Sequence, residues 1–212
     1  MGLLSKEDKE YLKNEFNKIT TDVNILFVTT DDEKKCEQCD NVRQIIDELT
    51  PLSDSVSFRE IDINSEELKQ YSVEMAPAMV LLNNGNGNIK YYGVPSGYEF
   101  SSLIDDIVDI GTGDIEMDDE VRSELEGIED NVHIRVFVTP TCPYCPAAVR
   151  IAHKFAMINP NIKADMIESY EFTEMADKYK VQGVPRVVIN ETVSFEGALP
   201  ENEYLAKIKE SL

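Results

Sequence analysis

The hydrophobic positions follow strand-like and helix-like patterns in turn along the chain. Residues 23–28 form a short apolar, β-branched run that is typical of a buried strand, and an apolar stripe at helical spacing follows it over 42–49. Alternation over 56–63 predicts a second strand, and the Asn-Gly pairs within 83–88 predict a hairpin turn. The same reasoning predicts helices over 5–19, 64–71 and 100–110, and strands over 79–82 and 89–92.

The second half of the chain repeats this order. It predicts helices over 118–126, 147–155 and 172–179 and strands over 134–138 and 162–167. Two short motifs recur in register, Cys-x-x-Cys and Tyr-x-Val-x-x-x-Pro. Glycines and an acidic run over 111–120 indicate a boundary. We therefore expect two units of one design, 1–112 and 113–212.

The order of elements within each unit indicates an α/β fold. Strand–helix–strand steps favour parallel pairing, whereas a tight Asn-Gly turn favours an antiparallel hairpin. Each unit should therefore be a mixed β-sheet flanked by helices.

Composition narrows the function classes. The 212 residues carry 20 Lys and Arg against 41 Asp and Glu, a net charge of -21, which argues against nucleic acid and anionic membranes as partners. No apolar run approaches the ~20 residues that span a bilayer. The N-terminus becomes charged within a few residues and does not look like a signal peptide, so we expect a cytoplasmic protein.

All four cysteines lie in Cys-x-x-Cys pairs, each between a predicted strand and a predicted helix. The pairs are Cys36-Glu-Gln-Cys39 and Cys142-Pro-Tyr-Cys145. A helix N-terminus directs unpaired N–H groups and its positive dipole end at the first sulfur, which favours the nucleophilic thiolate. This placement is a signature of thiol–disulfide redox chemistry.

These features resemble the thioredoxin superfamily, twice over. In thioredoxin-like proteins a cis proline that opens a strand sits against the cysteine pair, and here it would be Pro77 or Pro185, 41 residues after Cys36 and 43 after Cys142. The whole chain resembles the two-domain protein disulfide oxidoreductases of archaea and some bacteria, also called glutaredoxin-like proteins. A related pair of units opens the flavoprotein alkyl hydroperoxide reductase, where the first unit usually lacks its cysteines. Because this chain keeps both pairs and ends at Leu212, we expect the stand-alone family.

The resemblance implies a dithiol–disulfide oxidoreductase that reduces, forms or isomerises protein disulfides without a cofactor. In each pair the first cysteine attacks and the second resolves, so the redox disulfides would be Cys36–Cys39 and Cys142–Cys145. The implied electron donor is a thioredoxin-reductase-like flavoprotein, and the implied acceptors are peroxiredoxins and other protein disulfides. The residues expected to contact substrate are Ala76, Pro77, Tyr144, Val184, Pro185 and Arg186.

The two sites should differ in reactivity. No charged side chain lies between Arg135 and Arg150, and Arg186 should lie near Cys142, which favours a lowered Cys142 pKa. Acidic residues crowd Cys36, and negative neighbours disfavour a thiolate. They are Asp31, Asp32, Glu33, Glu37 and Asp40, offset by Lys34 and Lys35. We therefore expect Cys142–Cys145 to be the main catalyst.

Three other ionisable residues have side chains suited to a role in catalysis. His133 and His153 are expected to be structural or solvated. Asp62, on the strand after the first redox helix, is a candidate for burial near the sheet, where it could assist proton transfer at Cys39.

Two other functions fit the cysteines. Four thiolates can form a Cys₄ zinc site, but such sites usually join their pairs across a loop of about 15 to 20 residues. Here a complete unit lies between the pairs. The second alternative is a scaffold whose cysteines are incidental.

Overall fold

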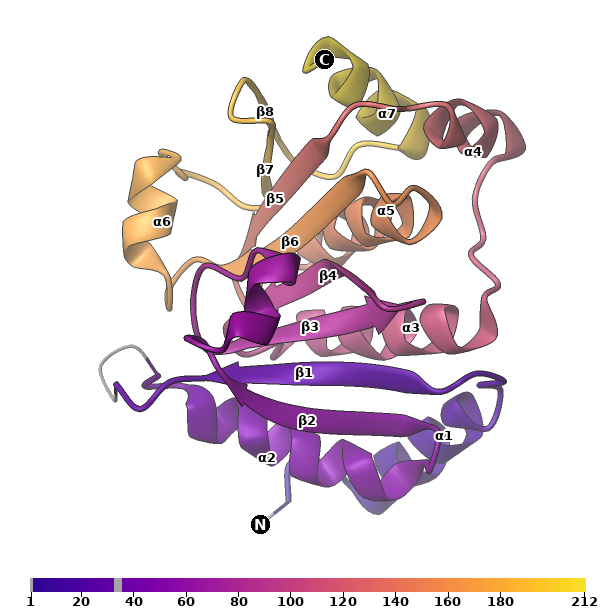
Figure 1. Cartoon of the computed structure of the whole chain (residues 1–212), viewed down its shortest axis with the longest axis vertical. Coiled ribbons are helices and arrows are strands. Elements are labelled where there is room, and N and C mark those ends of the chain that lie inside the picture. Colours follow the sequence, from indigo (N-terminus) through magenta and orange to yellow (C-terminus); the bar gives the residue numbers. More distant parts are fainter. Residues whose placement is uncertain (1, 33–35) are drawn as a thin grey trace.

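The computed structural model describes residues 2–32 and 36–212, and its first half contains the predicted elements in the predicted order (Figure 1). Ser5 and Asp8 cap the first helix reciprocally, each side chain accepting the backbone N–H of the other. Asn84 and Gly85 both have positive φ and form the tight hairpin turn. The elements are α1 (Lys6–Phe16), β1 (Val23–Thr29), α2 (Cys39–Leu49), η2 (Thr50–Leu52), β2 (Val56–Asp62), η3 (Glu66–Tyr71), β3 (Ala78–Asn83), β4 (Asn86–Tyr92) and α3 (Glu99–Thr112).

The second half repeats the first, as predicted. One detail is shared closely: the N–H of Gly93 donates to the carbonyl of Pro77 at 3.0 Å, and that of Gly197 donates to Pro185 at 2.9 Å. Both glycines have φ near +90°, which a side chain would strain. The elements are α4 (Asp119–Glu126), β5 (Val132–Val138), α5 (Cys145–Ile158), β6 (Ile162–Glu168), α6 (Thr173–Lys178), β7 (Arg186–Ile189), β8 (Val193–Glu196) and α7 (Glu201–Glu210).

The strands of the described residues join into one eight-stranded sheet, in the order β2-β1-β3-β4-β6-β5-β7-β8. Within each half the sheet is mixed, since β1 pairs parallel with β2 and antiparallel with β3, and β5 does the same with β6 and β7. The halves meet where β4 pairs parallel with β6, with Tyr91 opposite Met166. Consequently β1, β4, β6 and β5 all run in one direction.

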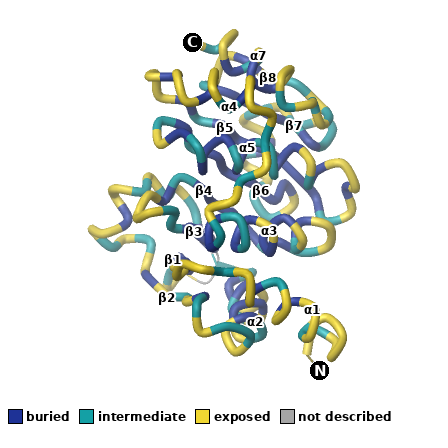
Figure 2. The backbone as a smooth tube through the Cα atoms, turned by 90° about the vertical axis from the view of Figure 1, so that its right-hand side faces the viewer, coloured by how far each residue is buried: buried dark blue, intermediate teal, exposed yellow. Residues whose placement is uncertain are grey.

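Hydrophobic side chains cover both faces of this sheet. The α-helices α1 to α5 and α7 pack on one face, and η3 and α6 pack on the other. Strand alternation divides the side chains between the faces: Phe27 belongs to the first cluster and Leu26 to the second. The buried segments in Figure 2 accordingly follow the strands and the inner sides of the helices.

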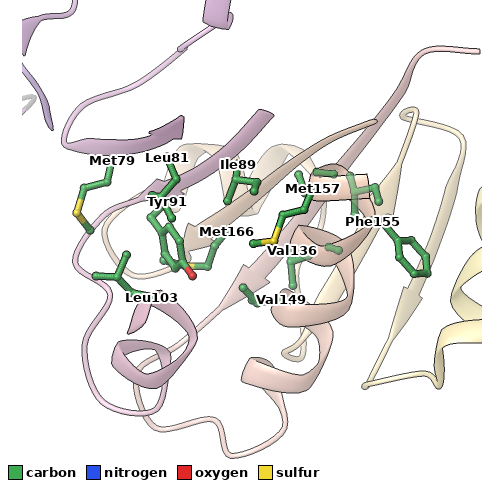
Figure 3. Close-up of a cluster of buried hydrophobic side chains, with 14 of the residues drawn as sticks. Met79, Leu81, Ile89, Tyr91, Leu103, Val136, Val149, Phe155, Met157 and Met166 are labelled. Atoms are coloured by element: carbon green, nitrogen blue, oxygen red, sulfur yellow. The ribbon is translucent and has the colours of Figure 1, made fainter. Parts of the chain in front are cut away.

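The larger core crosses the predicted boundary between the units. Figure 3 shows Tyr91 of β4 directed toward Met166 of β6 and Leu103 of α3. All three side chains are fully buried. The division into 1–112 and 113–212 stays a prediction, because one sheet and one core extend across it.

Buried polar groups also join the halves. Lys90 of β4 is fully buried, and its ammonium lies 3.0 Å from the carboxylate of Asp165 in β6. The other oxygen of Asp165 contacts Nε2 of His133 at 2.5 Å. Burial alone would raise the pKa of Asp165, but Lys90 and His133 lower it below its usual range.

No helix of the described chain is long and apolar enough to cross a membrane.

Candidate active site

The second cysteine pair lies where β5 gives way to α5. Cys142 and Cys145 form a disulfide with their Cα atoms 5.5 Å apart, and the N–H of Cys142 donates to the carbonyl of Thr139. The helix begins at Cys145 with Pro146 in its first turn, a position where the absent N–H costs no hydrogen bond. Cys145 is completely buried and Cys142 almost so, which leaves the first sulfur as the more accessible one.

The first pair occupies the same position between β1 and α2. Cys36 and Cys39 form a disulfide with their Cα atoms 5.1 Å apart. Cys36 is half-buried and Cys39 buried. Among its predicted acidic neighbours, Asp31, Asp32, Glu37 and Asp40 are exposed, whereas Glu33, Lys34 and Lys35 lie outside the described residues.

Both predicted prolines have cis peptide bonds, Ala76–Pro77 and Val184–Pro185. Each proline directly precedes the strand that pairs antiparallel with the strand leading to the cysteines. The cis geometry expected from the sequence is therefore confirmed, while the substrate-contact role of these four residues remains a prediction.

The other two predicted contact residues lie at the second site in different settings. Tyr144 stands between the cysteines with 71% of its surface exposed, so its ring is open to a partner. Arg186 opens β7, and its guanidinium bonds to Ser194 at 2.8 Å and lies 3.5 Å from Glu196. Its charge is therefore shared with an acid.

Asp62 is not a buried carboxyl, and that prediction was wrong. It is exposed and accepts hydrogen bonds from Asn64. Glu168 holds the matching place at the end of β6, and it is buried, so burial raises its pKa. The sequence pattern is alike at both strand ends, but β2 is the outermost strand of the sheet whereas β6 lies between β4 and β5.

Sequence reasoning missed Glu99. This residue opens α3 in the first half and is 1% exposed. Both carboxylate oxygens are buried without a hydrogen-bond partner among the described residues, and the nearby Ser102 hydroxyl offsets the effect of burial only in part. Burial raises the pKa of Glu99 to about 7.

The segment that carries Glu99 packs against the loop of the second cysteine pair. The N–H of the preceding Tyr98 donates to the carbonyl of Pro140 at 3.3 Å. A Cβ on Gly97 would overlap that same carbonyl, so only glycine fits there. A carboxyl whose pKa lies near neutral pH therefore sits on the segment of the first half that packs against the loop leading to Cys142.

Both disulfides lie at the same end of the sheet, just beyond the carboxyl ends of β1 and β5. β1 and β5 run in one direction and each leads into its cysteine pair, so the pairs meet that end together. Three strands lie between β1 and β5, which separates them by about 19 Å at the usual spacing of strands. The four sulfurs therefore cannot share one tetrahedral zinc ion, which rules out the Cys₄ alternative for this arrangement.

Comparisons with known proteins agree with this geometry. Residues 132–210 match the family described as thioredoxin domain. The chain is 23% identical to the alkyl hydroperoxide reductase AhpF of Pseudomonas aeruginosa and 26% identical to that of Escherichia coli, in each case over 97% of this chain and 37% of the relative. It thus spans well under half the length of these curated relatives.

Two solved structures cover nearly the whole chain. The alkylhydroperoxide reductase AhpF of Enterococcus faecalis matches at a TM-score of 0.89 and 25% identity, over 97% of this chain and 99% of that one. A protein disulfide oxidoreductase from Aeropyrum pernix matches at 0.88 and 27% identity, over 97% and 92%. Two Cys-x-x-Cys disulfides on this fold are the arrangement of a dithiol–disulfide oxidoreductase. Residues 132–210 thus carry a thioredoxin domain, and the whole chain shares its fold with these two solved structures.

Proposed function

We propose that this protein exchanges disulfides with protein substrates through both Cys-x-x-Cys pairs. The observation that carries the proposal is the repeated constellation: a disulfide at a strand-to-helix junction, with a cis proline opening the neighbouring strand. Its relatives by similarity include a protein named for this activity.

In the reductive direction, the thiolate of the first cysteine attacks a substrate disulfide and releases one substrate thiolate. The second cysteine then loses its proton and attacks the mixed disulfide, which releases the other substrate thiol and leaves the chain oxidised. Two electrons and two protons pass to the substrate in total. The reverse sequence forms a disulfide, and relative reduction potentials set the direction.

The contact residues have distinct parts in this scheme. The backbone of Ala76–Pro77 and Val184–Pro185 would border the substrate beside each sulfur, and Tyr144 would cover it at the second site. Arg186 would contact the substrate at the same place. Glu99 would accept the proton that Cys145 loses, because its carboxyl changes protonation near pH 7.

We assign the larger share of turnover to Cys142–Cys145. Its described neighbours carry no acid between Thr139 and Arg150, whereas Cys36 is bordered by Glu37 and Asp40. A negative neighbour opposes ionisation of a thiol. The first pair would then exchange disulfides more slowly and have a different reduction potential.

The partners follow from the relatives. Similarity to the alkyl hydroperoxide reductase AhpF supports a redox relay, in which a thioredoxin-reductase-like flavoprotein reduces this chain and a peroxiredoxin or another protein disulfide accepts the electrons.

Trapping tests the proposal. Cys145→Ser leaves the attacking Cys142 without its resolving partner, so a stable mixed disulfide with a substrate protein should accumulate and be seen by mass spectrometry. The matched Cys142→Ser variant should trap nothing through that site. Equal trapping by both variants would contradict the assigned roles.

A further inference from the structure

Two adjoining hollows link the redox sites along the shared end of the sheet. The larger, about 930 Å³, is lined by Gln38 and Pro77 of the first site and by the segment 170–175 of the second half. The smaller, about 270 Å³, is lined by Thr139 and by Val184, which precedes the second cis proline. Both include Tyr170 and Thr173, so they form one inter-site groove.

Tyr170 is the prominent side chain of this groove. It follows β6 and has 71% of its surface exposed. The backbone on either side of it is fixed, because Glu171 donates its N–H to Glu168 and its carboxylate accepts the N–H of Val94 at 2.9 Å. An exposed aromatic ring on a fixed turn loses little conformational freedom when a partner binds, and tyrosine is enriched among residues that dominate binding energy.

The charge of the groove specifies the partner. Its described lining residues include no Lys or Arg. Its ionisable side chains are acids: Asp32, Glu37, Glu74, Glu171, Glu174 and Asp177. The carboxylate of Glu74 lies 3.6 Å from Arg135, whose guanidinium offsets part of the negative charge of this surface. A segment carrying Lys or Arg would complement this surface.

The separation of the two sites favours one partner that reaches both. Thiol–disulfide exchange requires direct attack of one sulfur on another. Cysteine pairs at the ends of strands about 19 Å apart cannot make that contact within the folded chain. A segment lying in the groove would instead meet either pair from one bound position.

We propose that the inter-site groove binds an extended, positively charged segment of a disulfide-bearing protein, with Tyr170 as the contact shared by both redox sites. This inference rests on the proposed exchange activity and adds the substrate class and its docking surface.

Single-site chains provide the test. The variant Cys36→Ser/Cys39→Ser keeps only the second pair, and Cys142→Ser/Cys145→Ser keeps only the first. In each, KM and kcat are measured with a peptide that contains one disulfide flanked by lysines, with a Glu-flanked peptide of equal length, and with a small aromatic disulfide.

Tyr170→Ala should raise KM for the lysine peptide about fivefold or more in both single-site chains. Tyr144→Ala should raise it only where the second pair remains, and Tyr11→Ala, on α1, in neither. The Glu-flanked peptide should have the higher KM. The double variant Glu74→Gln/Glu174→Gln removes charge from the groove and should reduce the difference in KM between the two peptides. The control Glu10→Gln/Glu203→Gln, which changes two exposed acids outside the groove, should reduce it less.

Three results separate the two proposals. If neither single-site chain reduces the small disulfide, the exchange activity itself fails. If both reduce it but Tyr170→Ala changes KM at one site or at none, the shared contact is overturned. If the Glu-flanked peptide binds as well as the lysine peptide, the substrate class is overturned.

Discussion

The backbone N–H of Tyr98 donates to the carbonyl of Pro140, and this bond fixes the start of α3 against the loop that leads to Cys142. The second redox site is therefore built from both halves of the chain. The buried Glu99 follows Tyr98 directly in the chain, so the same contact holds its segment against this loop.

Glu99→Gln tests the proton-acceptor role. At pH 7.5 the exchange rate at Cys142–Cys145 should fall roughly tenfold to hundredfold, because the amide cannot accept the proton of Cys145. In the chain with Glu99, the exchange rate should rise as the pH increases through about 7. In the Glu99→Gln variant, this rise should be absent from the pH–rate profile. The measurement is a pH–rate profile in the Cys36→Ser/Cys39→Ser chain.

The same substitution in the Cys142→Ser/Cys145→Ser chain serves as the control. A purely structural effect would slow both single-site chains alike, whereas the proton-acceptor role predicts a loss confined to the second pair.

Glu99 should also make stability depend on pH. Its folded pKa of about 7 exceeds the 4.5 of an unfolded glutamate, so the native state holds a proton that the unfolded state has lost between these values. The contribution of protonated Glu99 to the unfolding free energy is therefore complete below pH 4.5. It declines by roughly 3 kcal/mol as the pH rises to about 7. Urea unfolding should be measured for the wild type and Glu99→Gln at several pH values in this range. The unfolding free energy of the wild type should fall more steeply with rising pH than that of the variant. Parallel curves would count against the buried, protonated state of Glu99.

The buried ion pair between Lys90 and Asp165 should stabilise the junction of the two halves. Lys90→Met leaves the carboxylate of Asp165 buried without its cation and should cost about 3–5 kcal/mol of unfolding free energy. Lys90→Met/Asp165→Leu removes both charges and should recover most of that loss, since His133 is partly exposed and can turn to water. Urea denaturation measures both, and a double variant less stable than the single one would refute this account.

The two attacking cysteines should differ in acidity. In reduced chains that keep one cysteine each, the alkylation rate should give Cys142 a pKa below the ~8.5 of a free thiol and below that of Cys36. The helix N-terminus acts on both sulfurs, but Glu37 and Asp40 act only on the first site. A lower value at Cys36 would reverse the assignment of the main catalyst.

Much of this fold was predictable because its signals are local. Apolar periodicity identified β1 and α2, and the recurrence of Tyr-x-Val-x-x-x-Pro identified the repeat. The resemblance to thioredoxin-like proteins then implied the two cis prolines. Helix α3 extends two residues beyond its predicted end, since Gly111 packs against Ile19 instead of opening a linker.

The features that depend on tertiary contacts were not predictable. Nothing in the pattern of β4 or β6 says that these strands pair across the repeat. Without that pairing, Glu99 reads as an ordinary acid in a first helical turn and Tyr170 as an exposed loop residue. Asp62 and Glu168 end equivalent strands, yet the first is solvated and the second buried, because β2 is the outermost strand of the sheet and β6 an interior one.

Catalysed reduction of a protein disulfide, such as those of insulin, tests the central claim most directly. With a chemical dithiol as the reductant, the wild type should accelerate reduction, and Cys142→Ser/Cys145→Ser should lose most of that acceleration. Cys36→Ser/Cys39→Ser should retain most of it, and the chain without all four cysteines should match the uncatalysed rate. If the variant that lacks all four cysteines were as active as the wild type, this result would contradict the account.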